Sequence, residues 1–236
     1  MTLPQLSHPL FDITIPSTGK KIRFRRYLVL EEKILLYAKQ EKTKTAIVQA
    51  IRQVIQNCAV DEFNINDCAS YDFDYIFLKL HAASVNNIIS VMYNDKEDEK
   101  QYKLEIDLDG VNVVFPDDWN TDPVKIKADE NVTMLLKYPT VGDMFDITEN
   151  LITNLDLVDQ LLVKCISSIY DANEVYDDFT QEELIQWIQG LNPEVYREVK
   201  KFYDRIPIIT HTIEFTNSLN NTKEVVLRGI EDFFMW

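Results

Sequence analysis

The chain opens with an alternation of apolar and polar residues. Phe11, Ile13 and Ile15 alternate with polar residues, and the alternation resumes at Ile22 and Phe24 after the sequence PSTG. Alternation places one set of side chains on a core face, and proline, serine and glycine favour turns. The pattern therefore predicts a β-hairpin, which we assign to an N-terminal arm over residues 1–27.

A helical periodicity replaces the alternation from residue 28. Apolar residues recur at helical spacing over residues 28–40, 46–57 and 72–84. Glu31 and Glu32 lie in the first turn of the first pattern, where negative charge favours a helix. Residues 28–85 are therefore predicted to be helical.

Strand patterns return at residue 86. Residues 88–93 and 102–108 predict two strands on either side of a charged tip at 94–100. Shorter strands are predicted after them, over residues 111–115, 124–128 and 132–138. We interpret residues 86–138 as an antiparallel β module.

A second helical segment is predicted over residues 139–206. Asp156 is a candidate N-cap for a helix whose apolar residues run as far as Ile169. Thr180 begins a capping box, and Pro193 occupies the preferred first position of the last helix.

The final segment, residues 207–236, returns to strand patterns and ends on an aromatic tail. Strands over 208–215 and 223–228 flank a polar tip at 216–222. The whole pattern predicts an α+β protein with a basic N-terminal β-hairpin, helical groups and an antiparallel β-hairpin module.

Composition excludes several classes of partner. The 236 residues are 46% hydrophobic and carry a formal net charge of −15. An acidic chain of this kind is a poor ligand for nucleic acid or for anionic lipid, so we expect neither as a partner. Cys58, Cys68 and Cys165 are scattered, which favours reduced thiols in a cytoplasm. We also expect no signal peptide and no membrane span.

The N-terminal hairpin concentrates positive charge in this acidic chain. The cations are Lys20, Lys21, Arg23, Arg25 and Arg26. They are either a solvated face that protects an edge strand from aggregation, or a surface that docks on an acidic patch of a partner or of another copy. The residues leave both interpretations open.

The aromatic tail is the second candidate contact element. Its residues are Phe233, Phe234, Met235 and Trp236. They either pack on the core of the protein itself or insert into a groove of a partner, because large apolar side chains dominate interface energetics.

Catalytic chemistry has no recognisable scaffold in this sequence. The three histidines are separated, and no HExxH, GxSxG, P-loop or GxGxxG pattern occurs. The run from Asp107 to Gly110 is typical of a β-turn rather than a calcium loop. An acidic cluster remains as a solvated loop between helices or a cation site: Asp171, Glu174, Asp177 and Asp178. We therefore assign no catalytic, cofactor-binding or metal-binding residue.

An ordered series of motifs resembles a known protein family. The motifs are ITIPSTGKKIRFR at 13–25, LEEKILL at 30–36, IRQVIQNC at 51–58, FDYIFLKLHAASV at 73–85 and GIEDFF at 229–234. In this order they resemble the T-even-type bacteriophage base plate protein family, which includes baseplate hub subunits and hub-assembly chaperones. Relatives can carry zinc-knuckle cysteines at the hairpin tips. The tips at 94–100 and 216–222 have no cysteine or histidine, so no metal is carried over.

The resemblance implies a non-enzymatic structural or assembly protein of the baseplate hub of a contractile-tailed phage. The implied partners are other hub, spike or tail-tube proteins, with self-association possible. The implied location is the virion baseplate, and the host cytoplasm during assembly. Two alternatives stay open: a tail-assembly chaperone absent from the finished particle, and a cation-dependent hydrolase that uses the cluster at 171–178.

Overall fold

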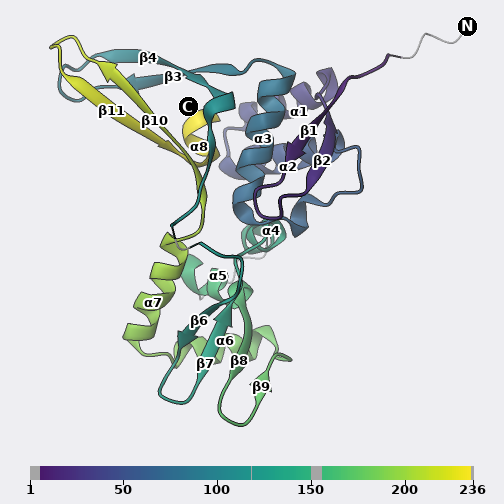
Figure 1. The fold of residues 1–236 in the computed structure, drawn as a ribbon, viewed down its shortest axis with the longest axis vertical. Helices are drawn as coiled ribbons and strands as arrows, with labels where there is room; N and C mark the ends of the chain where they lie inside the picture. Colours follow the sequence, from purple (N-terminus) through teal and green to yellow (C-terminus); the bar gives the residue numbers. More distant parts are fainter. Residues whose placement is uncertain (1–5, 118, 150–155, 235–236) are drawn as a thin grey trace, which may run out of the picture. The chain divides into compact units, whose positions relative to one another are not determined.

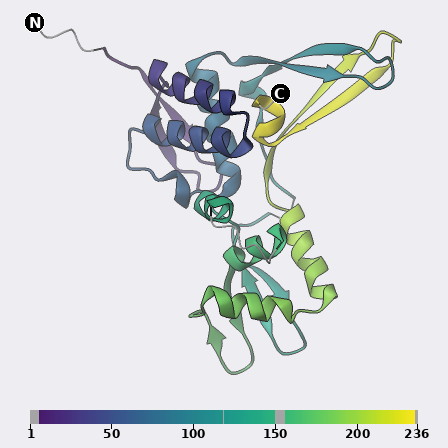
Figure 2. The ribbon, with the colours of Figure 1, turned by 180° about the vertical axis from the view of Figure 1, so that it is seen from behind.

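The computed structural model describes residues 6–117, 119–149 and 156–234 (Figures 1 and 2). Helices and small antiparallel sheets alternate along the chain, so the predicted α+β class is confirmed. The chain divides into two compact units. Unit 1 comprises residues 1–65, 71–114 and 208–236, and unit 2 comprises residues 66–70 and 115–207.

Unit 1 begins with the predicted N-terminal hairpin. Strand β1 (Leu10–Thr14) pairs antiparallel with β2 (Lys21–Arg25), with Asp12 opposite Arg23. Ile13, Ile15, Ile22 and Phe24 are buried, as the alternation predicts. Gly19 closes the turn with φ of +67°, a value that favours glycine.

Three helices accompany this hairpin. They are α1 (Val29–Glu41), α2 (Lys44–Cys58) and α3 (Ser70–Ser84), and a 3₁₀ turn η1 (Ile65–Asp67) precedes the third. Thr43 caps α2 by accepting a hydrogen bond from the Ala46 amide. Figure 2 shows α1 and α2 side by side. Ile51, Val54 and Ile55 of α2 are buried, so its apolar face forms part of the core of this unit.

Two long hairpins complete unit 1 and run side by side in both views (Figures 1 and 2). They are β3 (Ile88–Asn94) with β4 (Gln101–Asp107), and β10 (Ile208–Thr216) with β11 (Thr222–Arg228). Strand β5 (Asn112–Val114) joins the free edge of β10, after a 3₁₀ turn η2 (Leu108–Gly110), and α8 (Gly229–Phe234) follows β11. Their buried side chains form one apolar cluster with Leu78 of α3.

The tips of these two hairpins are joined by polar contacts. The Asn217 side-chain amide donates to the carboxylates of Asp95 and Glu97, at 2.9 Å each. The Ser218 hydroxyl donates to Asp98 at 2.8 Å, and Lys223 forms an ion pair with Glu97 at 2.5 Å. The polar residues of one tip therefore find their partners on the other.

Unit 2 is a four-stranded antiparallel sheet covered by helices. The sheet order is β6 (Val124–Lys127), β7 (Thr133–Leu136), β8 (Ile166–Tyr170) and β9 (Val175–Tyr176). The helices are α4 (Val141–Glu149), α5 (Leu157–Cys165), α6 (Gln181–Gln189) and α7 (Pro193–Asp204). Side chains of β6–β8 and α5–α7 form a second buried cluster.

One predicted helix in unit 2 is too long. The caps at Asp156 and Thr180 are confirmed, and Asn192 caps the helix that begins at Pro193. The helix that begins at 157, however, ends at Cys165, and the chain continues directly as strand β8. Ile166 and Ile169 are buried by the sheet, and pairing of β8 with both β7 and β9 outweighs the helical spacing. The acidic residues at 171–178 consequently lie in and after the β8–β9 turn, not between two helices.

The five predicted segments were drawn from sequence patterns, whereas the two units are defined by contacts in the structure. The boundaries at 27, 85, 138 and 206 follow changes of sequence pattern and stay a prediction. The contacts place residues 86–114 in unit 1 and residues 115–138 in unit 2.

Candidate protein-interaction site

Two of the five hairpin cations are paired within unit 1. The Arg23 guanidinium contacts the Asp61 carboxylate at 2.5 Å, and this raises the pKa of Arg23 and lowers that of Asp61. The Arg25 guanidinium contacts Glu31 at 2.8 Å. The Arg25 hydrogen bond lowers the pKa of Glu31, which is only 2% exposed. Both arginines therefore hold the hairpin to the rest of unit 1.

The other three cations face solvent. Lys20, Lys21 and Arg26 are exposed, and their side chains form no ion pair with any described residue. Charges of this kind steer association with an acidic surface and add little to the stability of the folded chain.

The aromatic tail is divided by its burial. Phe233 is fully buried and belongs to the apolar cluster of the two long hairpins. Phe234 is half-buried, with its ring 5.3 Å from that of Phe77 and 4.8 Å from that of His81. Met235 and Trp236 lie outside the described residues. Within unit 1, Phe233 and Phe234 are thus packed against the protein itself.

Helix α1 carries an exposed apolar face that the sequence pattern did not single out. Val29 and Leu30 are each 65% exposed, Leu36 is 53% exposed and Tyr37 is 60% exposed. Their spacings of one and seven residues place them on one side of the helix. The opposite side, which includes Ala38, is buried. Large apolar residues gathered on one helix face are typical of protein–protein contact surfaces.

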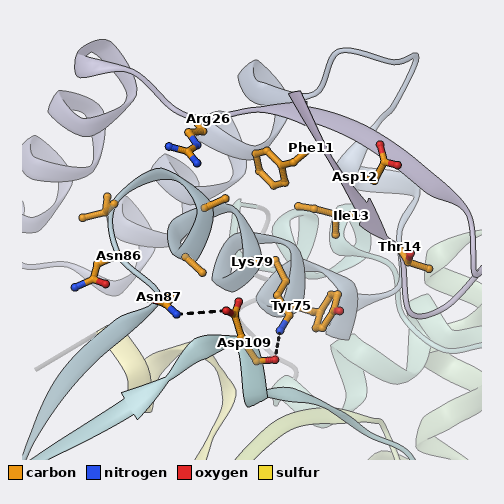
Figure 3. A pocket seen from close by; sticks show the side chains of 13 residues that line it. Phe11, Asp12, Ile13, Thr14, Arg26, Tyr75, Lys79, Asn86, Asn87 and Asp109 are labelled. Atoms are coloured by element: carbon orange, nitrogen blue, oxygen red, sulfur yellow. Dashed lines mark hydrogen bonds between the residues drawn. The ribbon is translucent and has the colours of Figure 1, made fainter. Parts of the chain in front are cut away.

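A groove runs between β1 and α3 (Figure 3). It is a hollow of about 660 Å³, lined on one side by residues 11–14 of β1 and on the other by Tyr75, Lys79, Ala82 and Ala83 of α3. Those four residues are spaced as one helix face. Arg26, Asn87 and Asp109 also line the groove.

The polar groups on the α3 side of the groove are held in place. The Lys79 ammonium donates to the carbonyls of Leu108 and Asp109, at 3.0 Å each. Burial lowers the pKa of Lys79, although Asp109 opposes this shift. The Asn87 side-chain amide donates to the Asp109 carboxylate at 3.3 Å (Figure 3). This wall is therefore preorganised, and its ammonium group is already hydrogen-bonded.

Asp171 and His81 have structural roles in the fold. The Asp171 carboxylate accepts the amides of Asn173 and Glu174, at 2.7 and 2.9 Å, which caps the β8–β9 turn and lowers its pKa. Burial lowers the pKa of His81 to about 4 and keeps the ring neutral. Over residues 6–117, 119–149 and 156–234, no cluster of three or more histidine, cysteine or acidic side chains is arranged to hold a metal ion.

Sequence reasoning missed both the groove and the apolar face of α1. The adjacent alanines at 82 and 83 and the repeat of apolar pairs at 29–30 and 36–37 were the available signals. Neither signal shows on its own which helix face is left uncovered, because burial depends on elements distant in sequence.

The chain belongs to the T4 bacteriophage base plate protein family, whose model matches residues 8–235. No curated protein and no solved structure matches the chain. Membership makes this a phage baseplate protein and implies contacts with other tail or baseplate proteins. In the described part of the chain, no helix combines the length and the apolar character that crossing a membrane requires.

Proposed function

We propose that this protein is a non-enzymatic component of the baseplate hub, and that it works through contacts with other hub, spike or tail-tube proteins. The observation that carries this proposal is the exposed apolar face of α1, defined by Val29, Leu30, Leu36 and Tyr37. A face of this composition favours burial against another protein.

The three solvent-facing cations support the same role. Lys20, Lys21 and Arg26 precede α1 in sequence and are free to meet acidic side chains of a partner. In a chain with net charge −15, a local positive surface orients an incoming partner and selects among partners.

A particle test addresses the contact role. A phage that lacks this gene would be complemented with wild-type protein, with a Leu30→Gln/Tyr37→Gln variant, or with a Leu219→Gln/Val226→Gln control. All four residues are exposed, so each variant should keep the urea midpoint of the wild type. We expect the α1 variant to lower the yield of infectious particles at least about tenfold, because the few residues that dominate an interface, tyrosine among them, each cost more than about 1 kcal/mol when they are lost.

A yield equal to that of the control would remove α1 as the contact surface. The second candidate function is a chaperone that leaves after assembly. Mass spectrometry of purified particles distinguishes the two. A few copies per baseplate support a hub component, whereas absence from particles with presence in the infected-cell lysate supports the chaperone.

A further inference from the structure

The groove between β1 and α3 is preformed, because the hairpin is fixed to α3 at two distant points. At the turn, the Ser17 amide and hydroxyl donate to the Asp72 carboxylate at 2.9 and 2.5 Å. After β2, the Tyr27 amide donates to the Ser84 hydroxyl at 3.1 Å. Asp72 and Ser84 lie near opposite ends of α3. The strand edge and the helix face are therefore held in place before any ligand binds.

The groove side of β1 presents unpaired backbone groups. The Ile15 amide donates to the Lys20 carbonyl at 2.9 Å, so the hydrogen-bonded positions of the hairpin include Phe11 and Ile13. Asp12 and Thr14 lie at the alternate positions, where amides and carbonyls point away from β2. No described residue bonds to these outward groups.

The contacts of β2 agree with this assignment of inward and outward positions. Arg23 faces Asp12 across the hairpin, and its amide donates to the Asp61 carboxylate at 2.8 Å. Its carbonyl accepts from the Val60 amide at 2.9 Å. The outer edge of β2 is thus covered by residues 59–61, and the outer edge of β1 is the open one.

The open edge of β1 lacks three of the features that discourage strand addition. Lysine, proline and bulges discourage edge pairing, but β1 contains none of them, and its one charged residue is Asp12. Lys21, Arg23 and Arg25 lie on the strand whose edge is already covered. The hairpin cations therefore do not protect the edge that is free to pair.

The walls indicate the side chains that a bound strand would carry. Ala82 and Ala83 are half-buried and small, and both line the hollow. They leave room for a larger apolar side chain. Arg26 lines the same groove and has no ion pair with a described residue, so it complements a carboxylate.

We propose that this groove binds an extended segment of another protein, which adds to β1 as a new strand, places an apolar side chain over Ala82 and Ala83, and sets a carboxylate against Arg26. Strand addition of this kind draws affinity from main-chain hydrogen bonds and specificity from side-chain pockets. A second copy is a poorer occupant, because antiparallel self-pairing centred on Asp12 would oppose two aspartates.

A proline substitution tests how much the backbone edge of β1 contributes to peptide binding. Asp12→Pro removes an outward amide and keeps the ladder with β2, since position 12 donates no bond to that strand. Asp12→Thr removes the same charge and keeps the amide, so it is the matched control. A random dodecapeptide display library would be selected on the full-length protein, and the selected peptides measured by fluorescence anisotropy.

We expect selected peptides to bind Asp12→Pro about tenfold more weakly than wild type, and Asp12→Thr within about twofold, because one main-chain hydrogen bond is lost only in the former. Arg26→Ala should weaken binding about threefold. Equal binding to Asp12→Pro and wild type, or a library that yields no peptide sensitive to this substitution, overturns the proposal. So does a concentration-dependent dimer of the protein that Asp12→Pro abolishes.

Amide exchange on the wild-type protein keeps the test decisive if the proline variant does not fold. Without peptide, the amides of Phe11 and Ile13 should exchange slowly and those of Asp12 and Thr14 rapidly. Peptide binding should slow exchange at 12 and 14, and unchanged rates there overturn strand addition. The inference builds on the proposed contact role, but these assays use purified protein, so their failure leaves the particle measurements to decide that role.

Discussion

The N-terminal hairpin and the two long hairpins of unit 1 differ in where their polar groups find partners. The long hairpins bring Asp95, Glu97 and Asp98 of one tip against Asn217 and Ser218 of the other. The N-terminal hairpin pairs two of its arginines inside the unit and leaves three cations and one strand edge open.

The difference shows that a charged hairpin is not by itself a docking element. Both regions read as hairpins with polar residues exposed at or near the turn. The polar residues at the tips of the two long hairpins form hydrogen bonds with each other, so they stabilise the fold. The N-terminal hairpin keeps hydrogen-bonding groups and charges that face solvent and are available to a partner. Four substitutions test this comparison.

Phe233→Ala should be the most damaging, because it removes a fully buried ring from the cluster that supports both long hairpins. We expect a loss of about 3–5 kcal/mol in the free energy of unfolding, measured by urea titration. Phe234→Ala, at a half-buried ring, is the matched control and should cost less. If Phe233→Ala has the stability of the wild type, the ring is available to a partner after all.

Arg25→Ala tests whether the N-terminal hairpin really divides into internal and external cations. It leaves the Glu31 carboxylate, 2% exposed, without its guanidinium, and we expect a loss of about 3 kcal/mol in urea unfolding. Arg26→Ala should change stability by less than about 0.5 kcal/mol. Equal effects of the two substitutions would show that the hairpin does not divide into internal and external cations.

Asn217→Ala tests the satisfied side of the comparison. The amide is 3% exposed, and its loss leaves the buried Asp95 carboxylate without that donor. We expect a cost of about 1–3 kcal/mol in unfolding free energy. Asn221→Ala removes an exposed hydrogen bond to Glu97 and should cost under about 0.5 kcal/mol. A reversed order would mean that the tips are held together by their exposed contacts.

Asp74→Asn tests how α8 is attached beneath the long hairpins. The Asp74 carboxylate accepts the Ile230 amide at 3.1 Å, and burial raises its pKa from 3.8 to about 7. Because the folded pKa lies above the unfolded one, the carboxyl destabilises the fold increasingly as pH rises from about 4 through 7. The variant should therefore be more stable than wild type at pH 8, because the asparagine side chain carries no charge to bury.

The same pair of proteins should have similar thermal midpoints at pH 4, where Asp74 is protonated in the fold. Thermal unfolding at both pH values is the measurement. A gain that is equal at pH 4 and pH 8 would show that the carboxyl does not titrate in this range.

Local elements of this protein followed from short-range sequence signals. The β1–β2 alternation, the capping box at Thr180 and the proline at 193 act within a few residues, so their elements were predictable without a tertiary structure. The helix predicted to run to Ile169 ends instead at Cys165, because long-range pairing rather than local sequence decides the structure of the residues that follow. Residues 166–170 are apolar enough for either state, and pairing with β7 and β9 determines that they form a strand.

The amino-acid pattern was enough to predict the α+β class, to locate the cations of the N-terminal hairpin and to show the order of motifs that places the chain in its family. The three-dimensional contacts were needed to show which cations are paired, that Phe233 is core, and that β1 has an open edge beside α3. Asp61, Glu31 and Asp72 meet the hairpin from other parts of the chain. Phe233 is buried in the cluster of the two long hairpins. Contacts of this kind join residues that are distant in sequence, so a pattern along one segment does not specify them.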